Sequence, residues 1–179
     1  MSSAAARRIR SAPRPGVALA LDHLHSLLAQ RPRLRAADLL GGARVLGRGF
    51  PSAGFDPLAW DAAIARGLPL QALDELLQAF QVSQQQVLES IGINVRSLQR
   101  KRKSPDSTLD PEAGARAVAL AHLVEKAVEV MGSPEAADQW LSTPNQALGG
   151  AAPLELAGRS LGNQAALDLL NSIDHGMFS

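Results

Sequence analysis

Basic side chains gather in one short stretch of this chain, where five Lys and Arg residues fall within eight positions. Guanidinium and ammonium groups bind phosphate oxygens, and an arginine can also form two parallel hydrogen bonds to the edge of a guanine base. Smaller polar side chains are interleaved with these cations. We therefore predict that the stretch contacts DNA through Arg96, Ser97, Gln99, Arg100, Lys101, Arg102 and Lys103.

The place of each residue along the stretch indicates its part in such a contact. A recognition helix reads base edges from its N-terminal turns and holds phosphates with its flanks. The predicted base contacts are Arg96, Ser97 and Arg100. The three consecutive cations at residues 101–103 are the predicted phosphate contacts.

Two short helices would present these side chains to a DNA groove. Val87 and Ile91 are spaced to share the inner face of a first helix. Gly92 then ends that helix, because glycine readily takes the positive φ of a tight turn. Asn94 is a good N-terminal cap for a second helix. Residues 83–103 are therefore predicted to form a helix-turn-helix.

The composition of the whole chain favours an all-α fold. The 179 residues are rich in alanine and leucine, and only 3% are aromatic. The net charge of +1 conceals an asymmetry between the two halves. Residues 1–103 hold 15 Lys and Arg against 7 Asp and Glu, whereas residues 104–179 hold 3 against 10. The basic half suits DNA, and the acidic half suits a protein surface.

Apolar periodicity, helix-start residues and glycine stops divide the chain into elements. The predicted helices outside the helix-turn-helix span residues 17–30, 34–46 (interrupted at Gly41), 57–66, 69–80, 111–131, 134–141 and 163–173. The long helix at 111–131 is expected to bury one apolar face. We predict a mobile basic arm at 1–16, a DNA-binding domain at 17–103 and a second helical domain at 104–179.

The chain shows no set of residues arranged for catalysis. It has no cysteine, which excludes disulfides, thiolate zinc sites and cysteine nucleophiles. It contains no glycine-rich nucleotide-binding loop and no hydrolase motif. Glu125 and Glu129 have the spacing of an ordinary solvated helix face. We therefore predict a protein that is not an enzyme and that uses no cofactor and no metal.

The sequence also bears on location. No apolar run approaches the length of about 20 residues that a membrane span requires. Prolines at 13 and 15 and the charge of Asp22 interrupt the only segment that resembles an export signal. We therefore expect the protein to act in the cytoplasm.

A second motif lies in the acidic half. Trp140-Leu141 is followed by Pro144-Asn145, by Leu148-Gly149-Gly150 and by Pro153-Leu154-Glu155-Leu156. This run resembles the toxin-binding domain shared by the Xre/MbcA/ParS antitoxins of bacterial type II toxin–antitoxin systems. The basic stretch and the helix before it resemble the Xre-like helix-turn-helix of the same antitoxins. The residues at 159–161 depart from the usual family pattern, which leaves the specificity for a partner open.

The resemblance implies a bacterial antitoxin that neutralises a toxin and represses its own operon. The implied partner is a RES-domain toxin that degrades NAD, whose active site the C-terminal end of the antitoxin occludes. Double-stranded operator DNA, a homodimer and a higher-order complex with the toxin are also implied. The toxin contacts implied by the resemblance are His175, Gly176, Met177, Phe178 and Ser179.

Several alternatives stay open on the sequence alone. The protein could be a stand-alone helix-turn-helix repressor whose C-terminal half only dimerises. It could also be a protein-binding inhibitor whose helix-turn-helix has lost its affinity for DNA. At the C-terminus, Phe178 could fold back onto the last helix instead of entering a partner. At the N-terminus, the basic arm could be unstructured or could contact DNA.

Overall fold

The structure is a computed structural model that describes residues 19–30, 33–51, 54–81, 84–90, 92–104 and 107–176. The predicted basic arm at 1–16 lies outside the described residues, and so do Ile91 and residues 177–179.

The prediction of an all-α fold is confirmed, because the described residues form helices and no β-strand. The helices are α1 (Leu21–Gln30), α2 (Ala36–Leu39), α3 (Gly42–Leu46), α4 (Pro57–Arg66), α5 (Leu70–Leu77), α6 (Gln84–Ser90), α7 (Val95–Lys101), α8 (Pro111–Met131), α9 (Pro134–Ser142), the 3₁₀ helix η1 (Gln146–Leu148), α10 (Pro153–Leu156) and α11 (Ser160–Asp174).

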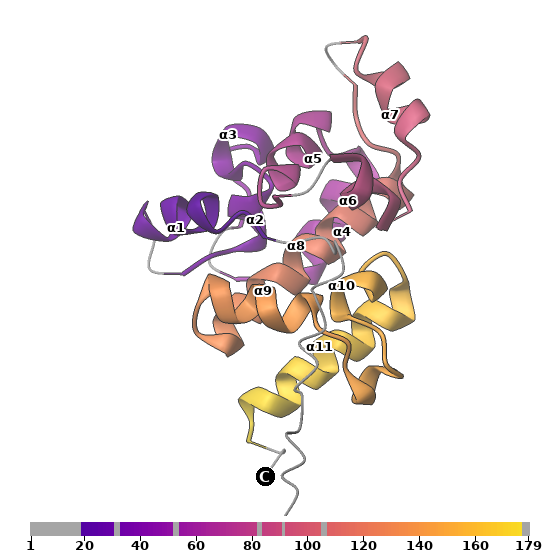
Figure 1. Ribbon diagram of the computed structural model, residues 1–179. Coiled ribbons are helices and arrows are strands. Elements are labelled where there is room, and N and C mark those ends of the chain that lie inside the picture. The colour runs from indigo at the N-terminus through magenta and orange to yellow at the C-terminus, as the bar shows by residue number, and fades with distance from the viewer. Residues whose placement is uncertain are drawn as a thin grey trace, which may run out of the picture.

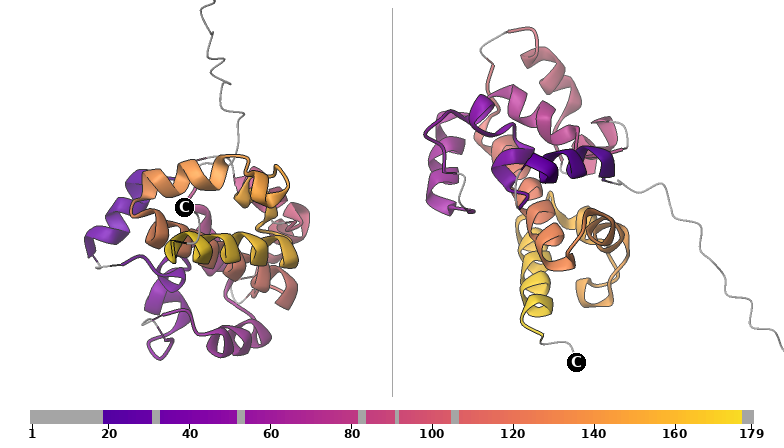
Figure 2. Two further views of the ribbon diagram at one scale, coloured as in Figure 1. Left: turned by 90° about the horizontal axis from the view of Figure 1, so that it is seen from below. Right: turned by 90° about the vertical axis from the view of Figure 1, so that its left-hand side faces the viewer.

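Helix α8 forms the axis of the fold. It contacts α2, α4 and α5 from the first half of the chain and α9 and α11 from the second half. In Figure 1 and in the right-hand view of Figure 2, the earlier helices lie at the top and the orange and yellow C-terminal helices lie at the bottom. A single helix therefore carries the packing of both halves.

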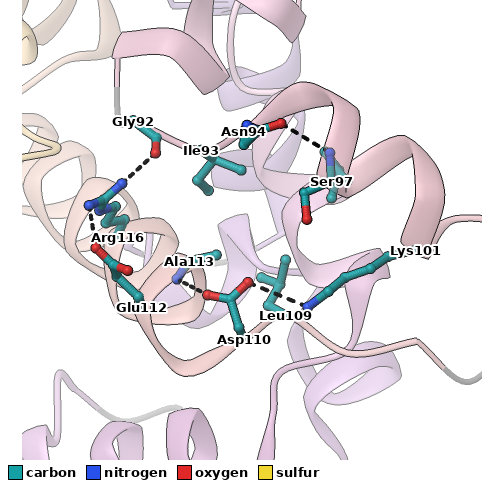
Figure 3. A pocket seen from close by; sticks show the side chains of 11 residues that line it. Gly92, Ile93, Asn94, Ser97, Lys101, Leu109, Asp110, Glu112, Ala113 and Arg116 are labelled. Carbon is teal, nitrogen blue, oxygen red and sulfur yellow. Dashed lines mark hydrogen bonds and ion pairs between the residues drawn. The ribbon is translucent and has the colours of Figure 1, made fainter.

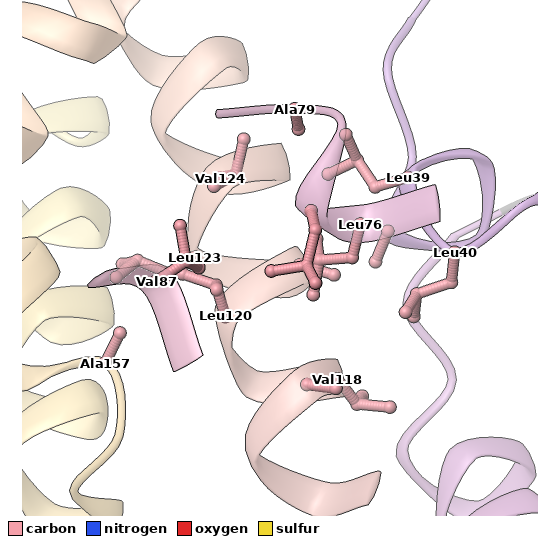
Figure 4. Close-up of a cluster of buried hydrophobic side chains, with 14 of the residues drawn as sticks. Leu39, Leu40, Leu76, Ala79, Val87, Val118, Leu120, Leu123, Val124 and Ala157 are labelled. Carbon is pink, nitrogen blue, oxygen red and sulfur yellow. The ribbon is translucent and has the colours of Figure 1, made fainter. Parts of the chain in front are cut away.

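The predicted apolar stripe of α8 is buried at Ala117, Leu120, Ala121, Val124 and Val128, and the burial extends further around the helix. Val118, Leu123 and Ala127 are buried in addition to the predicted stripe. Figure 4 shows Leu120, Leu123 and Val124 beside side chains from the segments around α2, α5 and α6. The sequence pattern predicts a single stripe because it cannot show that helices cover α8 from several sides.

Several predicted helix boundaries are confirmed by their caps. The side chain of Asp110 accepts a hydrogen bond from the backbone N–H of Ala113 at 2.9 Å, at the start of α8. Ser133 caps α9 in the same way, through the backbone N–H of Ala136 at 3.2 Å. Gly132 ends α8 with a φ of +82°. These residue types are the ones that predict the two helices from the sequence.

Other boundaries differ from the prediction. Helix α1 begins at Leu21 instead of residue 17, because the segment before it pairs with the segment after α5 through an isolated bridge between Leu19 and Phe80. The last helix begins at Ser160, three residues before the predicted start. A glycine at position 162 is unfavourable within a helix, so the sequence suggests a later start. In the structure, a Cβ at Gly162 would lie 3.0 Å from the Leu156 side chain, so glycine permits close packing there. The short helix α10 is absent from the prediction.

The interpretation of Glu125 as part of a solvated face is wrong. Its side chain is 7% exposed and accepts a hydrogen bond from the backbone N–H of Ala36 at 2.9 Å, at the start of α2. Arg35 donates to the other carboxylate oxygen at 3.4 Å. Burial raises the pKa of Glu125, while the two hydrogen bonds oppose that rise. Glu125 therefore ties α8 to α2 through a buried polar contact.

One turn earlier on α8, His122 fixes the loop that precedes α4. Its ring stacks on Phe55 with the ring centroids 3.6 Å apart and an interplanar angle of 7°. Burial is the main cause that lowers the pKa of His122 to about 4, and the nearby Lys126 lowers it further. The imidazole is therefore neutral near pH 7, as a histidine within a packed structure should be.

We predict that replacing Glu125 with Ala lowers the free energy of unfolding by about 1–3 kcal/mol, because the N–H of Ala36 would remain buried without an acceptor. Replacing Glu125 with Gln keeps an acceptor oxygen and should cost less than half as much. Urea unfolding followed by circular dichroism measures both values. Equal losses for the two variants would contradict the role of the Ala36 hydrogen bond.

Candidate nucleic-acid interface

The predicted helix-turn-helix is confirmed as α6, a turn and α7. Gly92 lies in the turn with a φ of +69°, which a residue with a Cβ rarely adopts. Ile93 follows it with 7% exposure, and its N–H donates to the carbonyl of Leu88 at 2.7 Å. Asn94 then caps α7, since its side-chain oxygen accepts from the backbone N–H of Ser97 at 3.0 Å. The local sequence therefore sets the angle between the two helices.

Four of the predicted DNA contacts face solvent. Leu98 is the buried residue of α7. Successive residues of an α-helix are rotated by about 100°, so Arg96, Gln99 and Arg100 point away from Leu98. All three are exposed, as is Lys103 just beyond the helix. Within the part of the chain that the structure describes, these four side chains make no hydrogen bond or ion pair.

The other three predicted contacts are turned toward the protein. Ser97 is half-buried and lines a cleft of about 160 Å³ between α7 and the start of α8 (Figure 3). The ammonium group of Lys101 donates to the carbonyl of Thr108 at 3.2 Å and to Asp110 at 3.4 Å. Arg102 forms an ion pair with Asp74. Lys101 and Arg102 are thus paired with other residues, and Ser97 faces the cleft. The roles of all seven candidates toward DNA stay predictions.

Arg116, which lines the same cleft from α8, holds the turn in place. Arg116 of α8 donates to the carbonyl of Gly92 and to the carboxylate of Glu112, at 2.5 Å in the second case (Figure 3). Asp110 also lines the cleft. The hydrogen bond from the N–H of Ala113 is the main cause that lowers the pKa of Asp110, and Lys101 lowers it further. Asp110 is therefore ionised near pH 7 and is able to pair with Lys101.

Sequence reasoning missed Arg116 and Asp74 as partners of this interface. Arg116 lies 24 residues from Gly92 and Asp74 lies 28 residues from Arg102, in helices whose own patterns predict only a core face. No spacing rule links residue 116 to residue 92. The one sequence feature that marks Arg116 is its charge, because it is one of three cations in an otherwise acidic half.

The described part of the C-terminal end is short and exposed. His175 follows the last turn of α11, and its Nδ1 lies 2.7 Å from the carbonyl of Asn171. Gly176 has a φ of +66°, so the backbone turns sharply after the helix. The remaining predicted toxin contacts, Met177, Phe178 and Ser179, lie outside the described residues. The predicted contacts of this end therefore stay predictions.

The described residues offer neither a metal site nor a membrane span. No group of three or more His, Asp or Glu side chains among them is placed to hold a metal ion. No described helix is long and apolar enough to cross a membrane.

Comparison with known families bears on the alternatives that the sequence leaves open. Residues 59–122 match the antitoxin Xre-like helix-turn-helix domain, and residues 126–176 match the antitoxin Xre/MbcA/ParS C-terminal toxin-binding domain. The chain belongs to the Xre/MbcA/ParS antitoxins. The first match includes α6, α7 and most of α8, and the second begins within the last turns of α8. The predicted division between residues 103 and 104 stays a prediction.

Two curated relatives carry the name Antitoxin Xre. The one from Yersinia enterocolitica is 29% identical over 118 residues, which cover 65% of this chain and 79% of the relative. The one from Photorhabdus laumondii is 26% identical over 132 residues, which cover 73% of this chain and 87% of the relative. The similarity therefore extends over most of the length of both relatives.

We predict that Gly92→Ala weakens the binding of this antitoxin to DNA, because a Cβ at that position would lie 2.7 Å from the Arg116 guanidinium and displace it from the turn. Gly132→Ala is the matched control, since Gly132 also has a positive φ but faces open space. Both variants should lose about 1–2 kcal/mol of stability from backbone strain. Equal effects of both variants on the affinity for duplex DNA would contradict the role of the Arg116 contact.

Proposed function

We propose that this antitoxin neutralises a RES-type toxin that degrades NAD, and that it represses its own operon by binding operator DNA. The toxin-binding domain match at residues 126–176 is the observation that carries the first half of the proposal. The proposed mechanism is occlusion, in which the C-terminal end of the antitoxin fills the active-site cleft of the toxin. The identity of the toxin rests on the resemblance between the chain and this antitoxin family.

The unpaired cations of α7 support DNA binding. Arg96 and Arg100 lie one helical turn apart on the exposed side of α7, and Gln99 lies beside them. Arginine and glutamine are side chains that form bidentate hydrogen bonds with purine edges in the major groove. Lys103 extends the positive surface past the end of the helix, where a phosphate backbone would run. This surface fits a recognition helix.

The geometry of the C-terminal end supports occlusion. His175 is exposed just after α11, and the positive φ of Gly176 ends the helix with a sharp turn of the backbone. The two residues that follow are Met177 and Phe178, whose apolar side chains suit a cleft in a partner. The competing interpretation, in which Phe178 folds back onto α11, predicts that the tail is dispensable for inhibition.

The two proposed interfaces are far apart on the antitoxin. Helix α7 and the C-terminal end of α11 lie at opposite ends of the molecule in Figure 1, and the right-hand view of Figure 2 agrees. A toxin bound at one end and DNA bound at the other would therefore not compete for the same surface. We further propose a homodimer that places two copies of α7 on adjacent half-sites, and larger complexes with toxin, in the bacterial cytoplasm.

Replacing Arg96 or Arg100 with Ala should weaken operator binding by about 1–3 kcal/mol, if each side chain forms a bidentate contact with a base. Arg159→Ala removes the same charge from an exposed position at the start of α11 and serves as the control. Gel-shift titrations of the three variants at one salt concentration provide the comparison. Unchanged affinity in both α7 variants would remove these residues from the recognition role and would point to the basic arm.

Deleting residues 175–179 should leave the fold and DNA binding intact but should release the activity of the toxin. The deletion removes no residue that the structure shows to be buried. NAD consumption by the toxin, measured with the full-length and the shortened antitoxin, tests occlusion directly. Replacing only Met177 and Phe178 with Ser separates the effect of the apolar anchors from the effect of chain length. Full inhibition by the shortened chain would refute the occlusion mechanism.

A further inference from the structure

Hydrophobic packing alone gives α7 a small anchor. The helix has seven residues, and Leu98 is its buried side chain. A helix of fewer than about 12–15 residues is only marginally stable in water without tertiary contacts. A recognition helix must also keep a fixed angle, because its side chains have to meet base edges in register. Polar contacts at the C-terminal end of α7 supply the additional fixation.

Lys101 ties α7 to the segment that leads into α8. Its ammonium group donates to the carbonyl of Thr108 and to the carboxylate of Asp110. The hydroxyl of Ser107 donates in turn to the carbonyl of Lys101 at 2.6 Å, which satisfies an acceptor at the end of the helix. Both the side chain and the backbone of Lys101 are thus engaged, and Figure 3 shows the side chain reaching Asp110.

Arg102 ties the same end of α7 to two other helices. Its guanidinium forms an ion pair with Asp74 of α5 and lies 3.4 Å from the side-chain oxygen of Gln84, at the start of α6. The side chains of Arg102 and Asp74 are 36% and 41% exposed, so the pair lies in a partly covered position. Arg102 therefore connects the second helix of the motif to its first helix and to the helix beneath.

The direction of these side chains separates them from the other cations. With a rotation of about 100° per residue, Lys101 and Arg102 fall on either side of Leu98, on the half of α7 that faces the protein. Arg96 and Arg100 fall on the opposite half. The five cations of the stretch thus do not form one surface, even though they lie within eight positions of the sequence.

We propose that Lys101 and Arg102 are positioning residues, which fix the angle of α7 on the protein through ion pairs with Asp110 and Asp74. Contact with DNA then rests with the cations left unpaired among the described residues, with Arg96 and Arg100 at base edges and Lys103 at a phosphate. This inference depends on the proposed DNA binding and revises the part played by residues 101 and 102. In this interpretation Asp74 and Asp110 support α7 through their ion pairs, although a free negative charge near this surface would repel DNA.

Hydrogen exchange of the full chain without DNA tests the positioning role by itself. Asp74→Asn removes the charge that holds Arg102, and the matched control Asp61→Asn removes an exposed acid from α4. Peptides that cover residues 95–103 should exchange faster in Asp74→Asn and at the wild-type rate in Asp61→Asn. Asp110→Asn should also speed this exchange, while asparagine keeps the cap of α8.

The two interpretations of Arg102 predict opposite changes in the affinity of the Asp74→Asn variant for DNA. The probe is a duplex that the wild-type chain recovers from a randomised library. If α7 loses its fixed angle, Asp74→Asn should weaken binding by about tenfold, the size of an ordinary coupling between contacting residues. If Arg102 binds phosphate, the same variant frees a cation and binding should tighten. Asp61→Asn reports the effect of net charge alone.

A charge swap completes the test. The double variant Asp74→Arg with Arg102→Asp re-forms the ion pair in reverse, and we expect it to bind the duplex within about threefold of wild type. The single variant Arg102→Asp should bind poorly. Lys103→Ala should lower the slope of log affinity against log salt by about 0.9, because it removes one cation that neutralises a phosphate, and the swap should leave that slope unchanged.

Two results would overturn the inference, and they are distinguishable from failure of DNA binding itself. The first is tighter binding by Asp74→Asn with unchanged exchange of residues 95–103. The second is loss of binding in the charge swap while circular dichroism shows a folded chain. Either result would return Arg102 to the phosphate contacts. A wild-type chain that recovers no duplex would instead refute the proposed DNA binding, while the exchange of residues 95–103 would still show whether the two ion pairs fix α7.

Discussion

The burial of α8 on several sides is the constraint on which the rest of this structure depends. A helix of 21 residues that is covered by α2, α4 and α5 from the first half of the chain and by α9 and α11 from the second half cannot shift without disturbing both halves. Its N-terminal cap Asp110 and its residue Arg116 also hold the recognition helix and its turn. The position of the DNA-binding surface is therefore set by the same helix that supports the toxin-binding domain.

In this arrangement several charged side chains hold helices in position, which their number and sign in the sequence would not indicate. Glu125 holds α2 from inside the core, and Asp74 and Asp110 engage cations of the basic stretch. An exposed ion pair usually contributes little to stability. Such a pair can still fix the direction of a short helix whose hydrophobic anchor is small, with Leu98 buried and Val95 half-buried, because direction depends on small differences in energy between orientations.

The sequence was sufficient for features that depend on local chemistry. Gly92, Asn94, Asp110 and Ser133 act at the turns and caps that their residue types predict, since a cap or a turn involves only neighbouring residues. Features set by distant packing were not predictable in this way. The wide burial of α8, the buried state of Glu125 and the pairing of Arg102 each depend on a segment far along the chain.

The most direct test of the account is whether one antitoxin chain holds toxin and DNA at the same time. The purified antitoxin would be loaded with an operator duplex and then titrated into the proposed RES-domain toxin, while NAD consumption and DNA binding are followed together. The account predicts that NAD consumption stops at a stoichiometric ratio while the duplex stays bound, because α7 and the end of α11 lie at opposite ends of the fold. Continued NAD consumption within the complex would contradict it.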